Sequence, residues 1–374
     1  MRAVIRTLGL SLLLAGSGAC REKNAKPDER ASVPAPSRAA AIESAASSGP
    51  SPSARRPRVY VSNEDSNDIS IVDSATDEVT GTIFVGKRPR GIRLAPDGKT
   101  LFVALSGSPK DPPGAHDGGR RPADLAADGI ALVDVATEKL VRTIASGRDP
   151  ECFDFTPDGK FLYVSNEEAG QASVVELATG SIVKTIALDE EPEGVTMKPG
   201  GDVVYVTSEA ANKVFAIDTK NNSITATIET GPRPRAIAFT PDGSRGFITE
   251  EQGSSLTVVD AKKHRALSHI KLEGTAHKPM GAVASADGKT IYVTTGRGRS
   301  VLYIDVASHR VVKTIDHVGV RPWGIGVSSD GRKLYTANGP SNDVSVIDVT
   351  SGEIKKRIGV GSLPWGVALS RSND

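Results

Sequence analysis

The chain has 374 residues, with 46 lysines and arginines against 45 aspartates and glutamates, so its formal net charge is +1 at pH 7. A balance this close to zero excludes a bulk electrostatic attraction to nucleic acid or anionic lipid. Cys20 and Cys152 are the two cysteines. If the chain is cleaved or lipidated at Cys20, no disulfide remains to hold the fold, which must then depend on packing.

Residues 1–19 have the features of an export signal. Arg2 and Arg6 precede the apolar run 8–15, and small residues come directly before Cys20. The run is too short to span a bilayer as a helix. The pattern is compatible with simple signal cleavage, but we favour lipidation, because a lone cysteine here has no other obvious use. We therefore expect an exported protein of the periplasm or cell envelope, tethered to the outer membrane through Cys20.

Residues 20–56 are rich in alanine, serine and proline and show no periodic apolar pattern. Such a segment buries too little apolar surface to offset its ordering entropy, so it is predicted to be a disordered tether. The repeats that follow occupy residues 57–370, and residues 371–374 form a short tail.

One short phrase recurs seven times from residue 89 onward: a proline, a variable residue and a small residue. Most copies lie about 42–45 residues apart, and one interval is about 61. The copies are Pro89-Arg90-Gly91, Pro150-Glu151-Cys152, Pro192-Glu193-Gly194, Pro234-Arg235-Ala236, Pro279-Met280-Gly281, Pro322-Trp323-Gly324 and Pro364-Trp365-Gly366. A repeat of this length, built from short alternating segments, predicts a propeller blade of four strands.

Other landmarks recur in each repeat. Turns such as Pro96-Asp97-Gly98 follow the inner strand, and second strands end in phrases such as Tyr60-Val61-Ser62-Asn63. The chain enters the repeats at a second strand and leaves them after an inner one, so its two ends should share one blade. We predict an all-β, seven-bladed propeller closed by this pairing. Arg93 and Asp154 interrupt the small face of consecutive inner strands. We predict that they form an ion pair between blades, and the alternative is a functional role in the channel.

The second-strand endings at Tyr60–Asn63 and 163–166 resemble those of the YVTN family of bacterial β-propellers, over about residues 57–370. Longer phrases, including Arg321-Pro322-Trp323-Gly324, are similar to propeller proteins associated with pyrroloquinoline-quinone-dependent catabolism. That resemblance implies an exported protein linked to quinone-dependent alcohol oxidation. It attaches no reaction to the chain.

In this strand order, the loops that enter the inner strands meet the loops that leave the second strands around the central channel. The variable residues should therefore form a ring at the mouth: Arg90, Glu151, Glu193, Arg235, Met280, Trp323 and Trp365. One interpretation is structural, with arginines and glutamates locking blades and tryptophans capping the core. The other is a ligand-binding site in which the indoles offer flat apolar surface and the charges orient a small polar ligand. An exposed charge pair contributes less than about 1 kcal/mol to the stability of the fold. Stability alone is therefore a poor explanation for so many charges in the ring.

Segment 106–128 should overhang the same mouth, either as a mobile flap or as an insertion without function. His116 and Asp117 within it are possible metal ligands, but no further ligand types cluster beside them in the sequence. We predict no metal and no cofactor.

The charges and side-chain types around the predicted mouth bear on the possible functions. Around the predicted mouth the loops carry eleven carboxylates and six cations. This charge balance disfavours binding to the phosphate backbone of DNA. There is no Cys-x-x-Cys-His, and His277 is the one histidine placed to ligate a haem. A lactonase-like hydrolase needs a general base and oxyanion donors, which Glu151 or Glu193 beside an arginine would supply. That alternative is supported by fold analogy alone. We predict an exported, non-catalytic binding or accessory protein, acting on a small polar ligand or a periplasmic protein partner.

Overall fold

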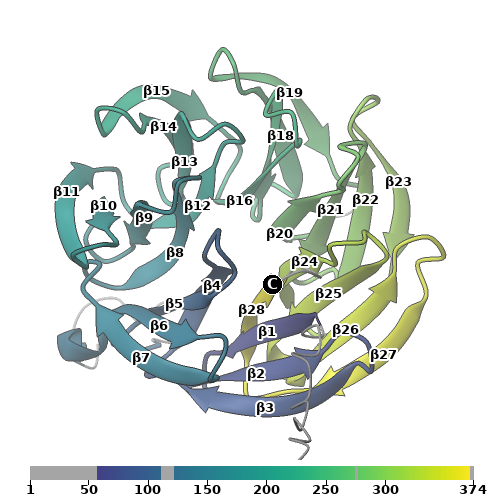
Figure 1. The fold of residues 1–374 in the computed structure, drawn as a ribbon. Coiled ribbons are helices and arrows are strands. Elements are labelled where there is room, and N and C mark those ends of the chain that lie inside the picture. The colour runs from purple at the N-terminus through teal and green to yellow at the C-terminus, as the bar shows by residue number, and fades with distance from the viewer. Residues whose placement is uncertain (1–56, 111–121, 274–276, 371–374) are drawn as a thin grey trace, which may run out of the picture. The chain divides into compact units, whose positions relative to one another are not determined.

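The computed structural model describes residues 57–110, 122–273 and 277–370. They form seven four-stranded antiparallel sheets arranged around a central channel (Figure 1). This confirms the predicted fold class. Among the described residues the helical elements are two short 3-10 turns, η1 (Leu125–Ala127) and η2 (Gly339–Ser341). No helix there has the length and apolar character needed to cross a membrane.

The seven inner strands line the channel, and each begins at the proline of the repeated phrase. We number their blades II to VII and then I, in chain order. The strands are β4 (Pro89–Leu94), β8 (Pro150–Phe155), β12 (Pro192–Met197), β16 (Pro234–Phe239), β20 (Pro279–Ala284), β24 (Pro322–Val327) and β28 (Pro364–Leu369). Proline is tolerated here because the first residue of a strand need not donate to the ladder.

The second strands are almost completely buried. They are β1 (Arg58–Asn63), β5 (Thr100–Leu105), β9 (Phe161–Asn166), β13 (Val203–Ser208), β17 (Arg245–Glu250), β21 (Thr290–Thr295) and β25 (Lys333–Asn338). Three of their tyrosines, Tyr163, Tyr205 and Tyr335, bond a neighbouring blade through the phenol oxygen. Tyr205 Oη lies 2.6 Å from His264 Nδ1, and Tyr335 Oη donates to Asp77 at 3.3 Å. A buried tyrosine hydroxyl needs such a partner, and the partner comes from another blade.

The third strands end in an acidic residue whose carboxylate caps the following turn, as Asp134 Oδ1 does for the backbone N–H of Thr137 at 2.7 Å. They are β2 (Asp68–Asp73), β6 (Gly129–Asp134), β10 (Gln171–Glu176), β14 (Lys213–Asp218), β18 (Ser255–Asp260), β22 (Ser300–Asp305) and β26 (Asp343–Asp348).

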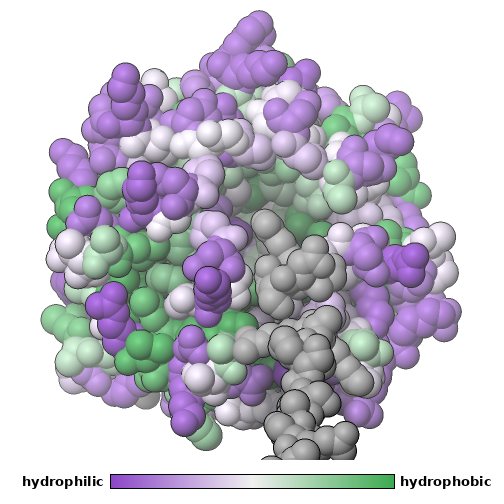
Figure 2. All heavy atoms as spheres, viewed as in Figure 1, coloured by the Kyte–Doolittle hydropathy of each residue, from purple (hydrophilic) through white to green (hydrophobic). Residues whose placement is uncertain are grey.

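The fourth strands form the rim of the propeller, and most of their side chains are exposed. They are β3 (Glu78–Phe84), β7 (Lys139–Ile144), β11 (Ser181–Ala187), β15 (Ser223–Glu229), β19 (Arg265–Lys271), β23 (Arg310–Ile315) and β27 (Ile354–Gly359). The face in Figure 2 shows mostly hydrophilic residues at its periphery, with some hydrophobic residues among them.

The two ends of the described chain close blade I, as predicted. β28 pairs with β1, opposing Leu369 to Val59 and Val367 to Val61, and β1 pairs with β2 on its other side. The C-terminal strand is thus the innermost strand of the blade that the N-terminal strands complete. This pairing removes the open inner edge that β1 would otherwise present.

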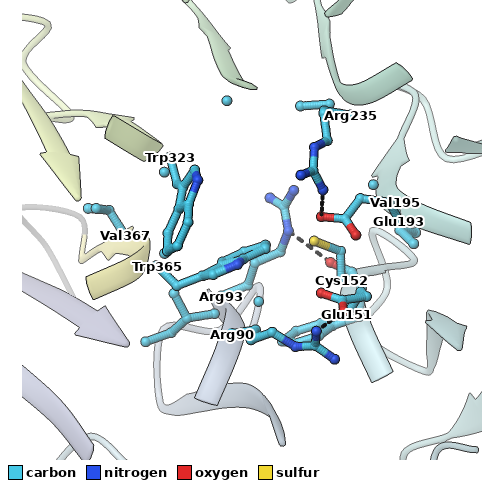
Figure 3. A pocket seen from close by; sticks show the side chains of 18 of the residues that line it. Arg90, Arg93, Glu151, Cys152, Glu193, Val195, Arg235, Trp323, Trp365 and Val367 are labelled. Atoms are coloured by element: carbon cyan, nitrogen blue, oxygen red, sulfur yellow. Dashed lines mark hydrogen bonds and ion pairs between the residues drawn. The ribbon is translucent and has the colours of Figure 1, made fainter. Parts of the chain in front are cut away.

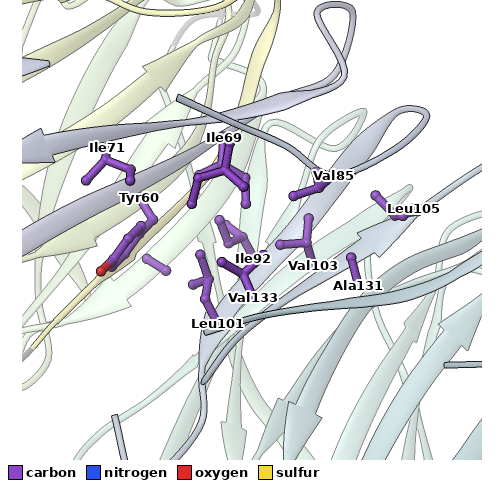
Figure 4. Close-up of a cluster of buried hydrophobic side chains, with 12 residues drawn as sticks. Tyr60, Ile69, Ile71, Val85, Ile92, Leu101, Val103, Leu105, Ala131 and Val133 are labelled. Atoms are coloured by element: carbon purple, nitrogen blue, oxygen red, sulfur yellow. The ribbon is translucent and has the colours of Figure 1, made fainter. Parts of the chain in front are cut away.

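The core lies between neighbouring blades. Figure 4 shows one such cluster, in which Tyr60, Ile69 and Ile71 of blade I pack against Ile92 and Leu101 of blade II. Comparable clusters recur around the propeller. Each blade therefore depends on its neighbours for burial.

Candidate functional site

The variable residue of each phrase lies in a bulge at the start of the inner strand. In β4, Pro89 is opposite Leu105 and Ile92 is opposite Val103, so Arg90 and Gly91 together face one residue of β5. The same shift recurs in the other six blades. A bulge of this kind redirects a side chain, and here it turns the variable residue toward the mouth of the channel.

In five of the seven blades a hydroxyl side chain near the end of the second strand fixes this bulge, and Ala104 and Ala337 take its place in the other two. Ser62 Oγ donates to the carbonyl of Arg90 on the next blade at 2.6 Å and accepts from the N–H of Gly366 at 3.0 Å. Thr207 bonds Arg235 and Gly194 in the same way. Because these bonds use only main-chain atoms of the ring residue, its side chain is free to vary between blades.

The small third residue of the phrase is needed for close approach. A Cβ built on Gly324 would lie 2.6 Å from the carbonyl oxygen of Trp365 on the next blade. Blades thus meet through main-chain atoms at this level, and the variable residues stand directly above the contact.

All seven predicted ring residues line one cavity of about 1350 Å³, which continues along the inner strands to Pro96 and Pro157 at the other end of the channel. The structure therefore brings together every residue that the repeat predicted for the ring. Figure 3 shows the indoles of Trp323 and Trp365 on one side of this space and the Arg235–Glu193 pair on the other.

The Arg90–Glu151 pair is a buried ion pair that joins blades II and III. Arg90 is 4% exposed and Glu151 is 2% exposed, and the two form an ion pair; Arg90 Nη2 also lies 2.5 Å from Asp149 Oδ1. Burial opposes the charge on Arg90, but Asp149 and Glu167 outweigh it and raise its pKa. The expectation that the ring charges are exposed is wrong for this pair, because the loops before β8 and after β9 enclose the guanidinium.

Asp149, Glu151 and Glu167 also bring carboxylate oxygens within 4.8 Å of one another, a spacing compatible with a cation. Arg90 contacts all three carboxylates. Its guanidinium therefore supplies the positive charge that this cluster requires.

The Arg235–Glu193 pair is more open. Arg235 Nη1 lies 3.2 Å from Glu193 Oε1, and Arg235 also contacts Glu209 and Glu251. Burial, reinforced by nearby Glu167 and opposed by Arg235, raises the pKa of Glu193. This is the combination that acid–base chemistry requires, because the carboxylate is more basic than an ordinary glutamate and faces a cavity.

Glu209, which directly follows β13, is a site residue to which the sequence analysis gave no role. Its carboxylate lies behind the ring, between Arg235 and Arg233, with Arg233 Nη2 at 2.8 Å from Oε2. Burial raises its pKa to about 8, against the opposing effect of Arg235. Its position at the end of a second strand was the available signal, but nothing local showed that two arginines would converge on it.

The other side of the ring is apolar and comes from blades VI, VII and I. Met280 is buried, whereas Trp323 and Trp365 are partly exposed to the cavity. The guanidinium of Arg321 stacks 5.2 Å from the centre of the Trp323 ring. The mouth thus offers a flat apolar wall opposite a carboxylate and its guanidinium.

Other predicted features fall outside the described residues or belong only in part to this site. His116, Asp117, Cys20 and the export signal fall outside the described residues. The start of segment 106–128 does reach the mouth, where Lys110 lies 2.8 Å from Glu64. His277, considered as a haem ligand, is not among the residues that line the cavity.

These features define a seven-bladed propeller with a charged and aromatic funnel at the mouth of its channel. The family model described as "Lactonase, 7-bladed beta-propeller" matches residues 53–199 and 194–362. The chain belongs to this lactonase family of seven-bladed β-propellers.

Solved structures of similar fold include the periplasmic gluconolactonase of Pseudomonas aeruginosa, with a TM-score of 0.68 and 22% identity over 84% of this chain and 99% of that one. A chain of hydrazine synthase from Kuenenia stuttgartiensis matches with a TM-score of 0.64 and 22% identity, over 76% of this chain and 90% of that one. Identities this low show the fold alone.

Among curated proteins, a 109-residue stretch is 28% identical to Antigen Lp49 of Leptospira interrogans serogroup Icterohaemorrhagiae serovar copenhageni. The match covers 29% of this chain and 23% of that protein, so the chain spans less than a quarter of the relative's length.

The family match corrects the predicted function. A non-catalytic binding or accessory protein was the main prediction, and the lactonase-like hydrolase was its alternative; the comparisons favour the alternative. The physical reason for the error is that a carboxylate beside an arginine reads in sequence as a structural ion pair. Only the folded mouth shows that the Arg90–Glu151 pair is less exposed than the Arg235–Glu193 pair.

Proposed function

We propose that this protein hydrolyses the ester bond of a lactone at the mouth of its propeller. The observation that carries the proposal is Glu193, a carboxylate of raised pKa that lines the cavity 3.2 Å from the guanidinium of Arg235. Membership of the lactonase family supports it.

Glu193 is the general base in this mechanism. Its Oε1 faces Arg235, and Oε2 has no partner among the described residues, so Oε2 accepts the proton of a water molecule as that water attacks the lactone carbonyl. A carboxylate whose pKa is raised takes this proton more readily than one in water. Glu151 is less suited to act as the general base, because it is held in the buried ion pair with Arg90.

Arg235 stabilises the oxyanion of the tetrahedral intermediate. Its Nε is bound to Glu251 at 3.0 Å and its Nη1 faces Glu193 and Glu209, which leaves Nη2 as the donor without a partner among the described residues. A donor held in place before reaction stabilises developing negative charge without reorganising. The intermediate then breaks its ring C–O bond, and the departing alkoxide takes the proton back from Glu193.

The tryptophans position the ring. Trp323 and Trp365 line the opposite side of the cavity and offer flat surfaces against which a small ring packs. The substrate class is therefore a small polar molecule with one apolar face.

The test is lactone hydrolysis followed by titration of the acid released, with the uncatalysed rate subtracted. We expect Glu193→Gln to lower kcat by about 10²- to 10⁴-fold, because general-base catalysis contributes that much. Glu229→Gln on the exposed strand β15 is the matched control and should behave as the native protein does. Failure of every lactone tested, or native rates in Glu193→Gln, would contradict the proposal.

We also propose that this activity is exported and held at the cell envelope through Cys20. The support is the sequence pattern of residues 1–56, which fall outside the described residues. The mass of the mature N-terminus tests it, since lipidation and simple cleavage give different masses. The association with quinone-dependent catabolism rests only on the sequence phrases of the resemblance, and none of the matched proteins named above carries it in its name.

A further inference from the structure

Glu250 ends the second strand of blade V, and it is a carboxylate where three other blades carry an amide. Its side chain is 1% exposed. The equivalent residues of the other second strands are Asn63, Leu105, Asn166, Ser208, Thr295 and Asn338. A buried carboxylate is far more costly than a buried amide unless a cation or several hydrogen bonds compensate its charge. Its presence in this one blade therefore needs a functional reason.

Other enclosed carboxylates of the propeller are paired with arginines. Glu151 forms its ion pair with Arg90. Asp154 lies 3.7 Å from Arg93 Nε, which confirms the ion pair predicted between their blades. Glu250 differs, because no lysine or arginine of the described residues lies within ion-pair distance of it.

Hydrogen bonds hold the Glu250 carboxylate instead. Ser255 Oγ donates to Oε2, Thr257 Oγ1 donates to Oε1, and the N–H of Gly231 donates to Oε1 at 2.7 Å. His269 Nδ1 lies 4.0 Å from the same Oε1. Three donors and one histidine therefore surround this charge.

The hydrogen bond between Glu250 and Thr257 runs opposite to its counterparts in other blades. There the amide Nδ2 donates to a serine at the place of Thr257: Asn63 to Ser70 at 2.9 Å, Asn166 to Ser173 at 2.8 Å and Asn338 to Ser345 at 3.0 Å. An ionised carboxylate has no proton to donate, so Thr257 is the donor in blade V.

The residue opposite Thr257 on the fourth strand also departs from the repeat. It is His269 of β19, whereas the equivalent residues are Thr82, Thr143, Thr185, Thr227, Thr314 and Arg357. His269 Nδ1 lies 2.9 Å from Thr257 Oγ1, and the histidine side chain is 58% exposed. The buried carboxylate and the exposed histidine thus occur in the same blade, joined by one threonine.

The direction of these bonds fixes the tautomer of His269. The Thr257 hydroxyl has one proton, and it donates that proton to Glu250. Its oxygen must then accept from His269, so the neutral imidazole carries its proton on Nδ1 and has none on Nε2.

Glu250 also fixes the loop that carries the arginines of the site. Its Oε1 binds the N–H of Gly231, two residues before Arg233. The next residue, Glu251, accepts from Arg235 Nε at 3.0 Å and donates its own N–H to the carbonyl of Arg233 at 2.9 Å. The end of β17 therefore holds both the backbone of this loop and the guanidinium of Arg235.

We propose that Glu250 is a positioning residue for Arg235, oriented by a hydrogen-bond relay that runs through Thr257 to His269 at the rim of blade V. A hydrogen bond to an ionised acceptor is about twice as strong as one to a neutral acceptor, so a carboxylate holds Gly231 better than an amide would. The effect on catalysis rests on the proposed function, in which Arg235 stabilises the oxyanion.

The relay is tested without any reaction, by nitrogen-15 NMR of the histidine rings. Neutral His269 should carry its proton on Nδ1, and His269→Gln identifies its signals by their loss. Thr257→Val removes the acceptor and Glu250→Asn reverses the bond to Thr257, so both should move the proton to Nε2. His317→Gln removes an exposed histidine of another blade and should leave the signals of His269 unchanged. A native ring protonated on Nε2, or Nδ1 protonation that survives Glu250→Asn, would contradict the relay.

Hydrogen exchange measures the hold on the loop. In Glu250→Asn the amide of Gly231 should exchange at least tenfold faster than in the native protein. The amide of Gly361, the equivalent glycine of blade I, donates to Ser70 Oγ and should exchange at its native rate. Should Glu250→Asn fail to fold, Glu250→Gln, which keeps an acceptor oxygen, should still raise the rate at Gly231 by about threefold. Unchanged exchange at Gly231 would show that Glu250 does not anchor the loop.

Kinetics test the effect on Arg235. Glu250→Asn should lower kcat about tenfold and leave KM unchanged, because a displaced donor weakens stabilisation of the transition state rather than substrate binding. Glu250→Gln should lose less, and Glu353→Asn, which removes an exposed carboxylate paired with Lys355, should match the native protein. A native kcat in Glu250→Asn would contradict the positioning role and leave the hydrolase intact. Absence of all hydrolysis would contradict the proposed function, and the tautomer and the exchange rates would still decide the relay and its hold on the loop.

Discussion

The two halves of the mouth share one backbone and carry opposite chemistry. Blades II to V place Arg90, Glu151, Glu193 and Arg235 on the ring, whereas blades VI, VII and I place Met280, Trp323 and Trp365 there. The bulge is the same in both halves, and a threonine hydroxyl fixes it in each. The carbonyl of Arg235 accepts from Thr207 at 3.1 Å, and the carbonyl of Trp323 accepts from Thr294 at 2.8 Å. The repeat therefore provides seven equivalent positions, and function depends on which side chain each one carries.

The charged half is itself divided. The side chains of Arg90 and Glu151 are 5% and 3% exposed and join blades, whereas those of Arg235 and Glu193 are 16% and 10% exposed to the same cavity. We assign stability to the first pair and chemistry to the second, and the following predictions test that division.

The largest effect should follow from removing part of the apolar half together with its strand. Truncation after Ser362 deletes β28 and Trp365, so β1 loses its inner partner and presents an open edge. We expect insoluble or molten protein, measured by near-UV circular dichroism and thermal melting. Truncation after Ser370 is the control and should melt as the native protein does. A soluble truncate that melts cooperatively would show that this closure is dispensable.

Within the charged half, Arg90→Met should cost about 3–5 kcal/mol of unfolding free energy, because it leaves Asp149 and Glu151 buried without their cation. Arg235→Met should cost less, because removing this cation raises the pKa of Glu209 further above its value of about 8, so that carboxyl group stays protonated and uncharged at neutral pH. Arg235→Met should instead abolish most hydrolysis. Urea unfolding measures the first effect, and equal losses of stability in the two variants would remove the distinction between the pairs.

The pH dependence of hydrolysis should reveal Glu193. The base acts when deprotonated, so kcat/KM should fall about tenfold per pH unit below its pKa. Since that pKa is raised above the ordinary value of 4.5, the decline should begin at a higher pH than for an exposed glutamate. Glu193→Gln should lose this acid limb. A native limb at or below 4.5 would assign the base to another group.

The smallest effect should come from the apolar half alone. Trp323→Ala should raise KM about tenfold or less and leave kcat unchanged, because aromatic stacking contributes about 0.5–1.5 kcal/mol to binding. Trp323→Phe keeps an aromatic face and should stay close to the native KM. A fall in kcat with unchanged KM would mean that the indole acts on the reacting group rather than on binding.

Much of the site could be predicted because its positions are set locally. The proline of each phrase begins an inner strand, the next residue lies in the bulge, and the small residue allows the blades to meet, so membership of the ring follows from the repeat. The character of each ring residue could not be predicted. Glu209 and Arg235 are on different blades, and no spacing in the chain shows that Arg233 also reaches that carboxylate.

The sequence by itself determined the number of blades, the shared blade at the two ends and the seven ring positions, because a repeat encodes the same local turns and pairings in each copy. Tertiary structure decided which ring charges are most buried and which carboxylates have a raised pKa. Burial and pKa depend on groups that loops from adjacent blades bring within a few ångströms, and that proximity is a property of the closed propeller rather than of any single repeat.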